Sequence, residues 1–127
     1  MAGETQFKTK VYRFLELEGI YPLGIEPQKI KAKPCGYYTK RWAGNRFTKS
    51  GLADLQLNVC GLCLDVELKG IGGTPSDLQL YNDAYIKRFG ISFVMYPKDF
   101  EKFKRFIRYI KRTMTKDYSN LWEKEWE

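Results

Sequence analysis

The sequence predicts an α/β domain with a mixed sheet flanked by helices, plus a basic helix at its C-terminal end. Residues 52–59 and 62–69 each alternate apolar and polar side chains, the period of two that is typical of half-buried strands. Stretches with helical periodicity lie before and after them, so helices and strands share one chain. At 127 residues the chain has the length of one domain, and we expect residues 1–127 to form it.

The first helix is predicted at residues 4–18, because Phe7, Val11 and Leu15 form one apolar stripe and Gly19 follows as a stop. Residues 20–50 are irregular and rich in Gly and Pro. We expect one strand there, at residues 28–33, followed by a basic loop.

A second helix is predicted after the two alternating strands. Thr74 serves as its N-cap, Pro75 occupies the first helical position, and Asp77 closes a pair that resembles a capping box. This helix is expected to run to Phe89 and to end at Gly90.

Residues 91–96 form a short, nearly all-apolar run, which predicts a buried strand at a central position of the sheet. A right-handed crossover through the preceding helix would make this strand parallel to residues 62–69. The sheet is therefore expected to be mixed.

The last helix is predicted to start near Pro97 and is strongly basic. Its apolar residues recur at spacings of three and four, and we interpret this stripe as core rather than as a dimer seam: Phe100, Phe103, Ile107, Ile110 and Met114. The acidic, Trp-rich residues 121–127 receive no assignment.

The charge balance excludes several classes of enzyme. Lys and Arg number 22 against 15 Asp and Glu, the formal net charge is +7, and there is no histidine. Serine–histidine–acid triads, histidine zinc sites and imidazole general bases are therefore excluded. Catalysis would have to use carboxylates, lysine, tyrosine, cysteine or a metal held by oxygen ligands.

The three cysteines indicate a reducing compartment, and we expect a cytoplasmic location. Cys60 and Cys63 have the spacing of a zinc or redox pair, but a structural zinc site needs four ligands. We interpret them as reduced thiols near a hairpin. No apolar run approaches the ~20 residues that span a membrane, so no membrane association is expected.

A basic segment follows Glu26, and no acid occurs between that residue and Asp54. It contains seven cations, a number equal to the net charge of the chain: Lys29, Lys31, Lys33, Lys40, Arg41, Arg46 and Lys49. Cations that neutralise phosphates, next to aromatic rings, are typical of a nucleic-acid surface. Tyr37, Tyr38 and Trp42 in this segment are consistent with base stacking and equally with packing of the loop.

The polar faces of the two alternating strands predict a site. If Cys60 and Gly61 form a two-residue turn, residues whose numbers sum to 121 stand opposite each other, so Asp54 faces Glu67. Their Cβ atoms would then be about 4.5–5.5 Å apart, close enough for one divalent cation to bridge both carboxylates. Lys69 would emerge on the same face, roughly 6.5–7 Å farther along. A three-residue turn would destroy this arrangement.

The residues of this site resemble the PD-(D/E)xK nucleases, and most of all their small stand-alone VRR-NUC branch of phages, which is similar to Holliday-junction resolvases. The matching segments are Gly51-Leu-Ala-Asp54-Leu, Leu64-Asp-Val-Glu67-Leu-Lys69 and Ser76-Asp-Leu-Gln79. The resemblance covers approximately residues 4–106 and implies a restriction-endonuclease-like αβββαβ core. Ala53 departs from the proline that is usual in the family, and the basic residues 34–50 are not a family signature.

The resemblance implies Mg²⁺ or Mn²⁺ bound by Asp54, Glu67 and the carbonyl of Leu68. It also implies that Lys69 lies at the attacking water, that Gln79 supports the site, and that Glu4 is the glutamate of the first helix. The expected activity is metal-dependent hydrolysis of phosphodiester bonds in DNA, with branched DNA among the substrates. The expected assembly is a homodimer, without an organic cofactor, in the host cytoplasm if a phage encodes the chain.

Two alternatives remain open at this point. Glu67, Lys69 and Asp65 can form the solvated face of an antiparallel sheet, and Asp65 can be either an outer metal ligand or a solvent-facing acid. The chain can also be a non-catalytic nucleic-acid-binding or assembly protein that uses the basic segment and the basic last helix.

Overall fold

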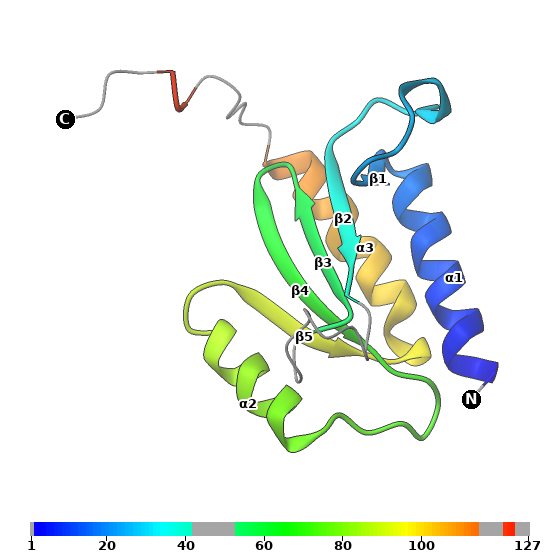
Figure 1. Cartoon of the computed structure of the whole chain (residues 1–127), viewed down its shortest axis with the longest axis vertical. Helices are drawn as coiled ribbons and strands as arrows, with labels where there is room; N and C mark the ends of the chain where they lie inside the picture. Colours follow the sequence, from blue (N-terminus) through cyan, green and yellow to red (C-terminus); the bar gives the residue numbers. More distant parts are fainter. Residues whose placement is uncertain (1, 42–52, 115–120, 124–127) are drawn as a thin grey trace.

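A five-stranded mixed sheet with helices on both faces organises the protein (Figure 1). The computed structural model describes residues 2–41, 53–114 and 121–123. Its strands are β1 (Ile20–Pro22), β2 (Gly36–Lys40), β3 (Leu55–Val59), β4 (Leu62–Leu68) and β5 (Ile91–Met95), in that order across the sheet. β1–β2 and β4–β5 are parallel, whereas β2–β3 and β3–β4 are antiparallel. The predicted α/β class with a mixed sheet is confirmed.

Two helices, α1 (Ala2–Leu17) and α3 (Phe100–Thr113), cover one face of the sheet. They form one core with the apolar sides of β3 and β4; Val11, Leu57, Leu64 and Ile107 are at most 1% exposed. The apolar stripe of the last helix therefore belongs to the core, as predicted, apart from Met114, which follows the helix and is exposed.

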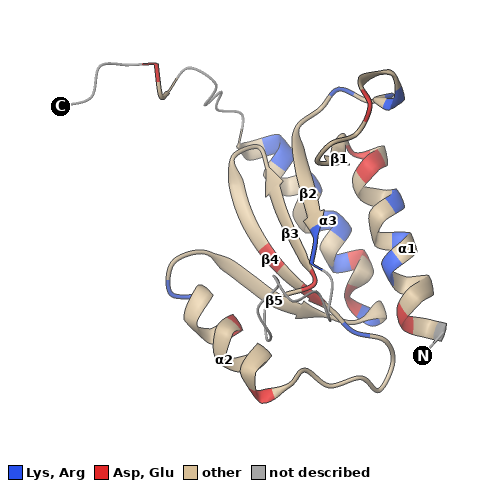
Figure 2. Cartoon of the chain, in the orientation of Figure 1, with Lys and Arg blue, Asp and Glu red and all other residues tan. Residues whose placement is uncertain are grey.

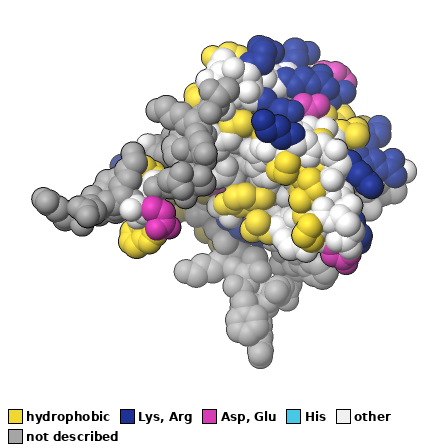
Figure 3. Space-filling model, turned by 90° about the horizontal axis from the view of Figure 1, so that it is seen from above, with side chains coloured by type: hydrophobic (Ala, Val, Ile, Leu, Met, Phe, Trp, Pro, Cys, Tyr) yellow, Lys and Arg dark blue, Asp and Glu magenta, His cyan; other side chains and the backbone are white. Residues whose placement is uncertain are grey.

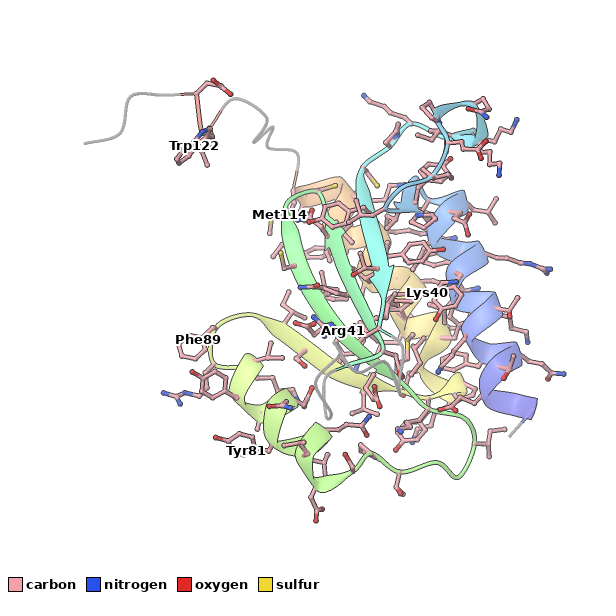
Figure 4. All side chains as sticks on the ribbon, viewed as in Figure 1. Lys40, Arg41, Tyr81, Phe89, Met114 and Trp122 are labelled. Atoms are coloured by element: carbon pink, nitrogen blue, oxygen red, sulfur yellow. The ribbon has the colours of Figure 1, made fainter. Side chains whose placement is uncertain are left out.

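The third helix, α2 (Asp77–Ile86), lies on the opposite face of the sheet, near β5. Ser92 of β5 donates a hydrogen bond to Asp83 of α2 (2.6 Å) and is buried. None of the α2 residues is buried, and the labelled side chains of Tyr81 and Phe89 point away from the sheet (Figure 4). Two polar contacts join this helix to the sheet, Asp83 to Ser92 and Gln79 to Glu67.

Residues 28–33 do not form the predicted strand. Pro27–Lys29 is a 3₁₀ turn (η1), and the sheet resumes only at Gly36. The hydroxyl of buried Tyr21 accepts hydrogen bonds from the backbone amides of Lys31 (2.9 Å) and Ala32 (2.6 Å). In a strand these two amides would donate to a neighbouring strand, but here they are bound by the Tyr21 side chain.

The start of α2 also differs from the prediction. Its N-cap is Ser76 instead of Thr74: Ser76 accepts a hydrogen bond from the amide of Gln79, and the Gln79 side chain accepts one from the amide of Ser76. The helix ends at Ile86, and a turn then leads to Gly90.

β5 lies at an edge of the described sheet, not at its centre as predicted. Its apolar composition has a different cause, because α2 and α3 cover its two faces. Ser92 bonds to Asp83 of α2, whereas Phe93 contacts the rings of Phe103 and Phe106 on the α3 side. A strand covered on both faces has an apolar sequence wherever it lies in the sheet.

The remaining boundaries shift by a few residues. A 3₁₀ turn, η2 (Pro97–Asp99), precedes α3, and Cys35, Cys60 and Cys63 are all free thiols, as interpreted. Among the described residues, no helix is long and apolar enough to cross a membrane. Arg46, Lys49, Trp42 and residues 124–127 lie outside the part of the chain that the structure describes.

Gly36→Ala should destabilise the protein by about 1–3 kcal/mol, because an added Cβ would lie 1.9 Å from the carbonyl oxygen of Asn58 on β3. Gly3→Ala is the matched control: it meets nothing within 4 Å and should stabilise α1 by up to about 1 kcal/mol. Urea unfolding measures both. Equal effects of the two substitutions would contradict the close β2–β3 approach.

Candidate functional site

A two-residue turn sets the register of the β3–β4 hairpin. Cys60 (φ 52°) and Gly61 (φ 94°) both adopt positive φ, as a type I′ turn requires. Gln56 stands opposite Asp65. The register is the predicted one, in which opposing residues sum to 121.

This register brings Asp54, just before β3, opposite Glu67 near the end of β4. The backbone amide of Asp54 donates to Glu67 Oε1 (3.0 Å), and the amide of Leu68 donates to Asp54 Oδ2 (3.0 Å). Each carboxylate therefore accepts a hydrogen bond from the backbone of the other strand. The two predicted acids lie side by side at one end of the sheet.

Glu67 is the buried member of the pair, with only 5% of its surface exposed. Burial, followed by the hydrogen bond and negative charge of Asp54, raises the pKa of Glu67 to about 7. Lys69 Nζ lies 3.3 Å from Glu67 Oε2, and Gln79 Nε2 donates to the same oxygen. Lys69 and Gln79 thus converge on Glu67 from the end of β4 and from α2.

Asp54 faces the first helix. Lys8 Nζ lies 3.9 Å from Asp54 Oδ1, and burial, followed by the Asp54 charge, raises the pKa of Tyr12 to about 12. The sequence reasoning missed Lys8 as a site residue. Glu4, Lys8 and Tyr12 recur every four residues and so share one face of α1, a signal that could have identified it.

Glu4 lies at the edge of the site. A Cβ added to Gly70, the residue after Lys69, would be 3.0–3.1 Å from the backbone N, Cα and Cβ of Glu4. The first turn of α1 therefore packs against the chain immediately after the catalytic candidates on β4.

Asp65 lies two residues before Glu67 on the polar face of β4 and is paired with Arg41. Arg41 Nη1 is 3.1 Å from Asp65 Oδ1 and donates to the Ala53 carbonyl (3.3 Å), while the Arg41 amide donates to the Asp54 carbonyl (2.7 Å). These contacts make Asp65 the partner of a cation. Arg41 was predicted only as a nucleic-acid-binding cation of the basic segment, and its pairing with Asp65 was not.

The described cations of the basic segment lie in two places. Lys40 and Arg41 are at the end of β2 that faces the site, where Lys40 Nζ stands 4.3 Å from the centre of the Tyr12 ring (Figure 4). Lys29, Lys31 and Lys33 are exposed in the loop that precedes the other end of β2. The structure brings only the first pair to the carboxylates.

The two carboxylates fit a magnesium ion of the kind that proteins bind with one or two acids, retaining water and substrate phosphate as its other ligands. Carboxylate oxygens are hard ligands. Burial, followed by the hydrogen bond and charge of Asp54, raises the pKa of Glu67, and a bound cation would favour its charged form. Within residues 2–41, 53–114 and 121–123 there is no cluster of three or more His, Cys, Asp or Glu that could hold a metal. The Leu68 carbonyl stays a predicted ligand.

Comparison with protein-family models, curated proteins and solved structures finds no match to the chain. A function can therefore be proposed only from the geometry of the site and from the sequence motifs.

Glu67→Gln should change the pH dependence of folding in the absence of divalent metal. The pKa of Glu67 is raised from 4.5 to about 7 on folding, so its stabilising protonation is complete below pH 4.5 and is lost as the pH rises to 7. Glutamine does not titrate, so the free energy of unfolding of the variant should rise by up to about 3 kcal/mol relative to that of wild type as the pH increases from 4.5 to 8.

Urea unfolding in EDTA at a series of pH values measures this difference, because titrations away from the Asp54–Glu67 pair are shared by the two proteins. Exposed Glu26, in the loop before β2, provides the control substitution Glu26→Gln, whose stability curve should run parallel to that of wild type. A parallel curve for Glu67→Gln would contradict the raised pKa.

Proposed function

We propose that the chain is a divalent-metal-dependent endonuclease that hydrolyses phosphodiester bonds in DNA. The structure has one strand more than the expected αβββαβ core, the short β1 between α1 and β2; the remaining order α1, β2, β3, β4, α2, β5 agrees with that core. The parallel β4–β5 pair and the antiparallel β2–β3–β4 strands are also consistent with it.

The observation that carries the proposal is the convergence on Glu67. Asp54 and Gln79 reach it from motifs that are distant in the sequence, while Lys69 belongs to the same motif as Glu67. A solvated sheet face does not require a buried acid, yet Glu67 is 5% exposed. Burial of a charged group that needs partners is typical of a functional site.

Each residue has a distinct role in this proposal. A bound Mg²⁺ or Mn²⁺ would neutralise the scissile phosphate and acidify a water molecule. Asp54 and Glu67 supply its carboxylate ligands, and Gln79 orients Glu67 through its amide. Lys69, held beside Glu67, positions the water and stabilises the negative charge that develops on the phosphate.

A second candidate function, non-catalytic binding of nucleic acid, is favoured by one observation. Lys8 and Lys69 already oppose the charges of Asp54 and Glu67, and both acids accept backbone hydrogen bonds. A network balanced in this way can join β3 to β4 without chemistry. Cleavage assays separate the two functions.

Incubation with Mg²⁺ should give metal-dependent cleavage of linear, flapped or four-way DNA. Glu67→Gln and Asp54→Asn should each reduce the cleavage rate at least about 100-fold, because each removes a carboxylate that would hold the metal at the reacting phosphate. Gln79→Ala should reduce it about 10–100-fold by releasing Glu67.

Glu26→Gln, which removes one exposed negative charge away from the site, should cleave like wild type. No metal-dependent product on any of the substrates, or undiminished cleavage by Glu67→Gln, would refute the nuclease and favour the binding protein. Sedimentation of the same samples tests the proposed homodimer.

A further inference from the structure

The outward side of α3 is a cationic surface that the proposed site does not use. The helix contains six Lys and Arg residues and one acid, Glu101, in its first turn. Its apolar side is committed to the core, since Phe103, Ile107 and Ile110 are at most 3% exposed. Figure 2 shows the basic residues along α1 and α3, which lie together on the same face of the sheet.

Three of the six cations form ion pairs with acidic residues of the protein. Lys104 Nζ lies 2.8 Å from Glu101, while Arg108 Nε (3.6 Å) and Lys111 Nζ (3.1 Å) both contact Glu18, the residue after α1. The two pairs with Glu18 join α3 to the turn that follows α1, and the other three cations of the helix face solvent.

The other three, Lys102, Arg105 and Arg112, are exposed and form no ion pair within the described part of the chain. At about 100° per residue they fall within roughly 80° of the helix circumference, with half-exposed Tyr109 among them. We call these three cations the α3 stripe.

The length of the α3 stripe suits a nucleic-acid backbone. From Lys102 to Arg112 the helix rises about 15 Å, and one strand of duplex DNA carries a phosphate every ~3.4 Å of axis, so the stripe spans about four phosphates. Two of its three members are arginines, whose planar guanidinium groups bind phosphate oxygens in pairs.

A membrane surface fits less well. An amphipathic helix that binds lipid inserts its apolar side, but in α3 that side is buried in the core. Exposed Lys10 and Arg13 on neighbouring α1 extend the positive surface, and Figure 3 shows Lys and Arg side chains gathered along one side of the molecule.

The stripe also begins near the candidate site. The Lys69 amide donates to the Met95 carbonyl at the end of β5 (3.0 Å), and η2 leads from there directly into α3. Lys102 is in the first turn of α3, and the stripe then runs away from that end of the sheet. DNA held at the carboxylates would have a cationic track beside its flanking part.

We propose that the α3 stripe is a second nucleic-acid surface, which binds the backbone of duplex DNA next to the position held by Asp54 and Glu67. Its place beside the cleaved phosphate rests on the proposed function, but binding by the stripe itself does not. The two can therefore be tested separately.

Anisotropy of a fluorescent 24-base-pair duplex, measured in EDTA over a range of KCl concentrations, tests the stripe without cleavage. The triple variant Lys102→Gln, Arg105→Gln, Arg112→Gln should raise Kd at least about tenfold at low salt. It should also make the slope of log K against log[salt] less negative by up to about 2.7, or 0.9 for each phosphate that the variant no longer neutralises.

The charge-matched control is Lys87→Gln, Arg88→Glu, at two exposed cations that follow α2 on the opposite face of the sheet. It lowers the net charge by as much as the α3 variant does and should affect Kd much less. Equal losses in the two variants would overturn the proposal, because only net charge would then matter, as would a Kd of the α3 variant within twofold of wild type. Loss of binding to phosphatidylserine vesicles with unchanged DNA binding would also overturn it.

Failure of the proposed function looks different. If the protein never cleaves DNA but the α3 variant loses metal-free binding, the α3 stripe is supported and the nuclease is refuted. If the protein cleaves DNA but the α3 variant binds it normally, the nuclease is supported and the stripe is refuted. Thermal unfolding of each variant verifies that the exposed substitutions preserve the fold.

Discussion

The geometry of the candidate site depends on the turn at Cys60 and Gly61. Two residues with positive φ allow a tight hairpin, and this length alone fixes which residues of β3 and β4 stand opposite each other. A slip of one residue would move Asp54 to the apolar face of the sheet. With the observed register, the amides of Asp54 and Leu68 bind the carboxylates across the hairpin. Lys69 and Gln79 then contact the Glu67 carboxylate, which this register has set beside Asp54.

The part of the site that the sequence predicted is the part that local geometry determines. Alternation with a period of two assigns the faces, and the turn length assigns the register, so Asp54, Glu67 and Lys69 could be brought together without a structure. The contact of Gln79 with Glu67 came from the motif, and the Ser76–Gln79 capping box was also present in the sequence. Lys8 was not predicted at all and Arg41 only as a cation of the basic segment, because their approach to the carboxylates depends on how α1 and β2 pack against the hairpin.

The errors share a physical cause, which is that long-range contacts override local preference. Residues 28–33 look extended, but the Tyr21 hydroxyl takes two of their amides. β5 is apolar because helices cover both of its faces, and this composition does not distinguish an edge from a centre. The basic segment is continuous in sequence, but β2 separates Lys33 from Lys40, so charge that is contiguous along the chain is divided in space. The α3 stripe shows the converse, since a helix gathers cations that lie three and seven residues apart.

Paramagnetic broadening by Mn²⁺ tests most directly whether the paired carboxylates are a cation site. The backbone amides of Asp54 and Leu68 donate to these carboxylates, so their NMR signals report on an ion bound there. Substoichiometric Mn²⁺ should broaden these two signals before any others in the described chain, and the double variant Asp54→Asn, Glu67→Gln should abolish the effect. Broadening centred on Asp83 or Glu18, or broadening at the hairpin that survives the double substitution, would contradict the account.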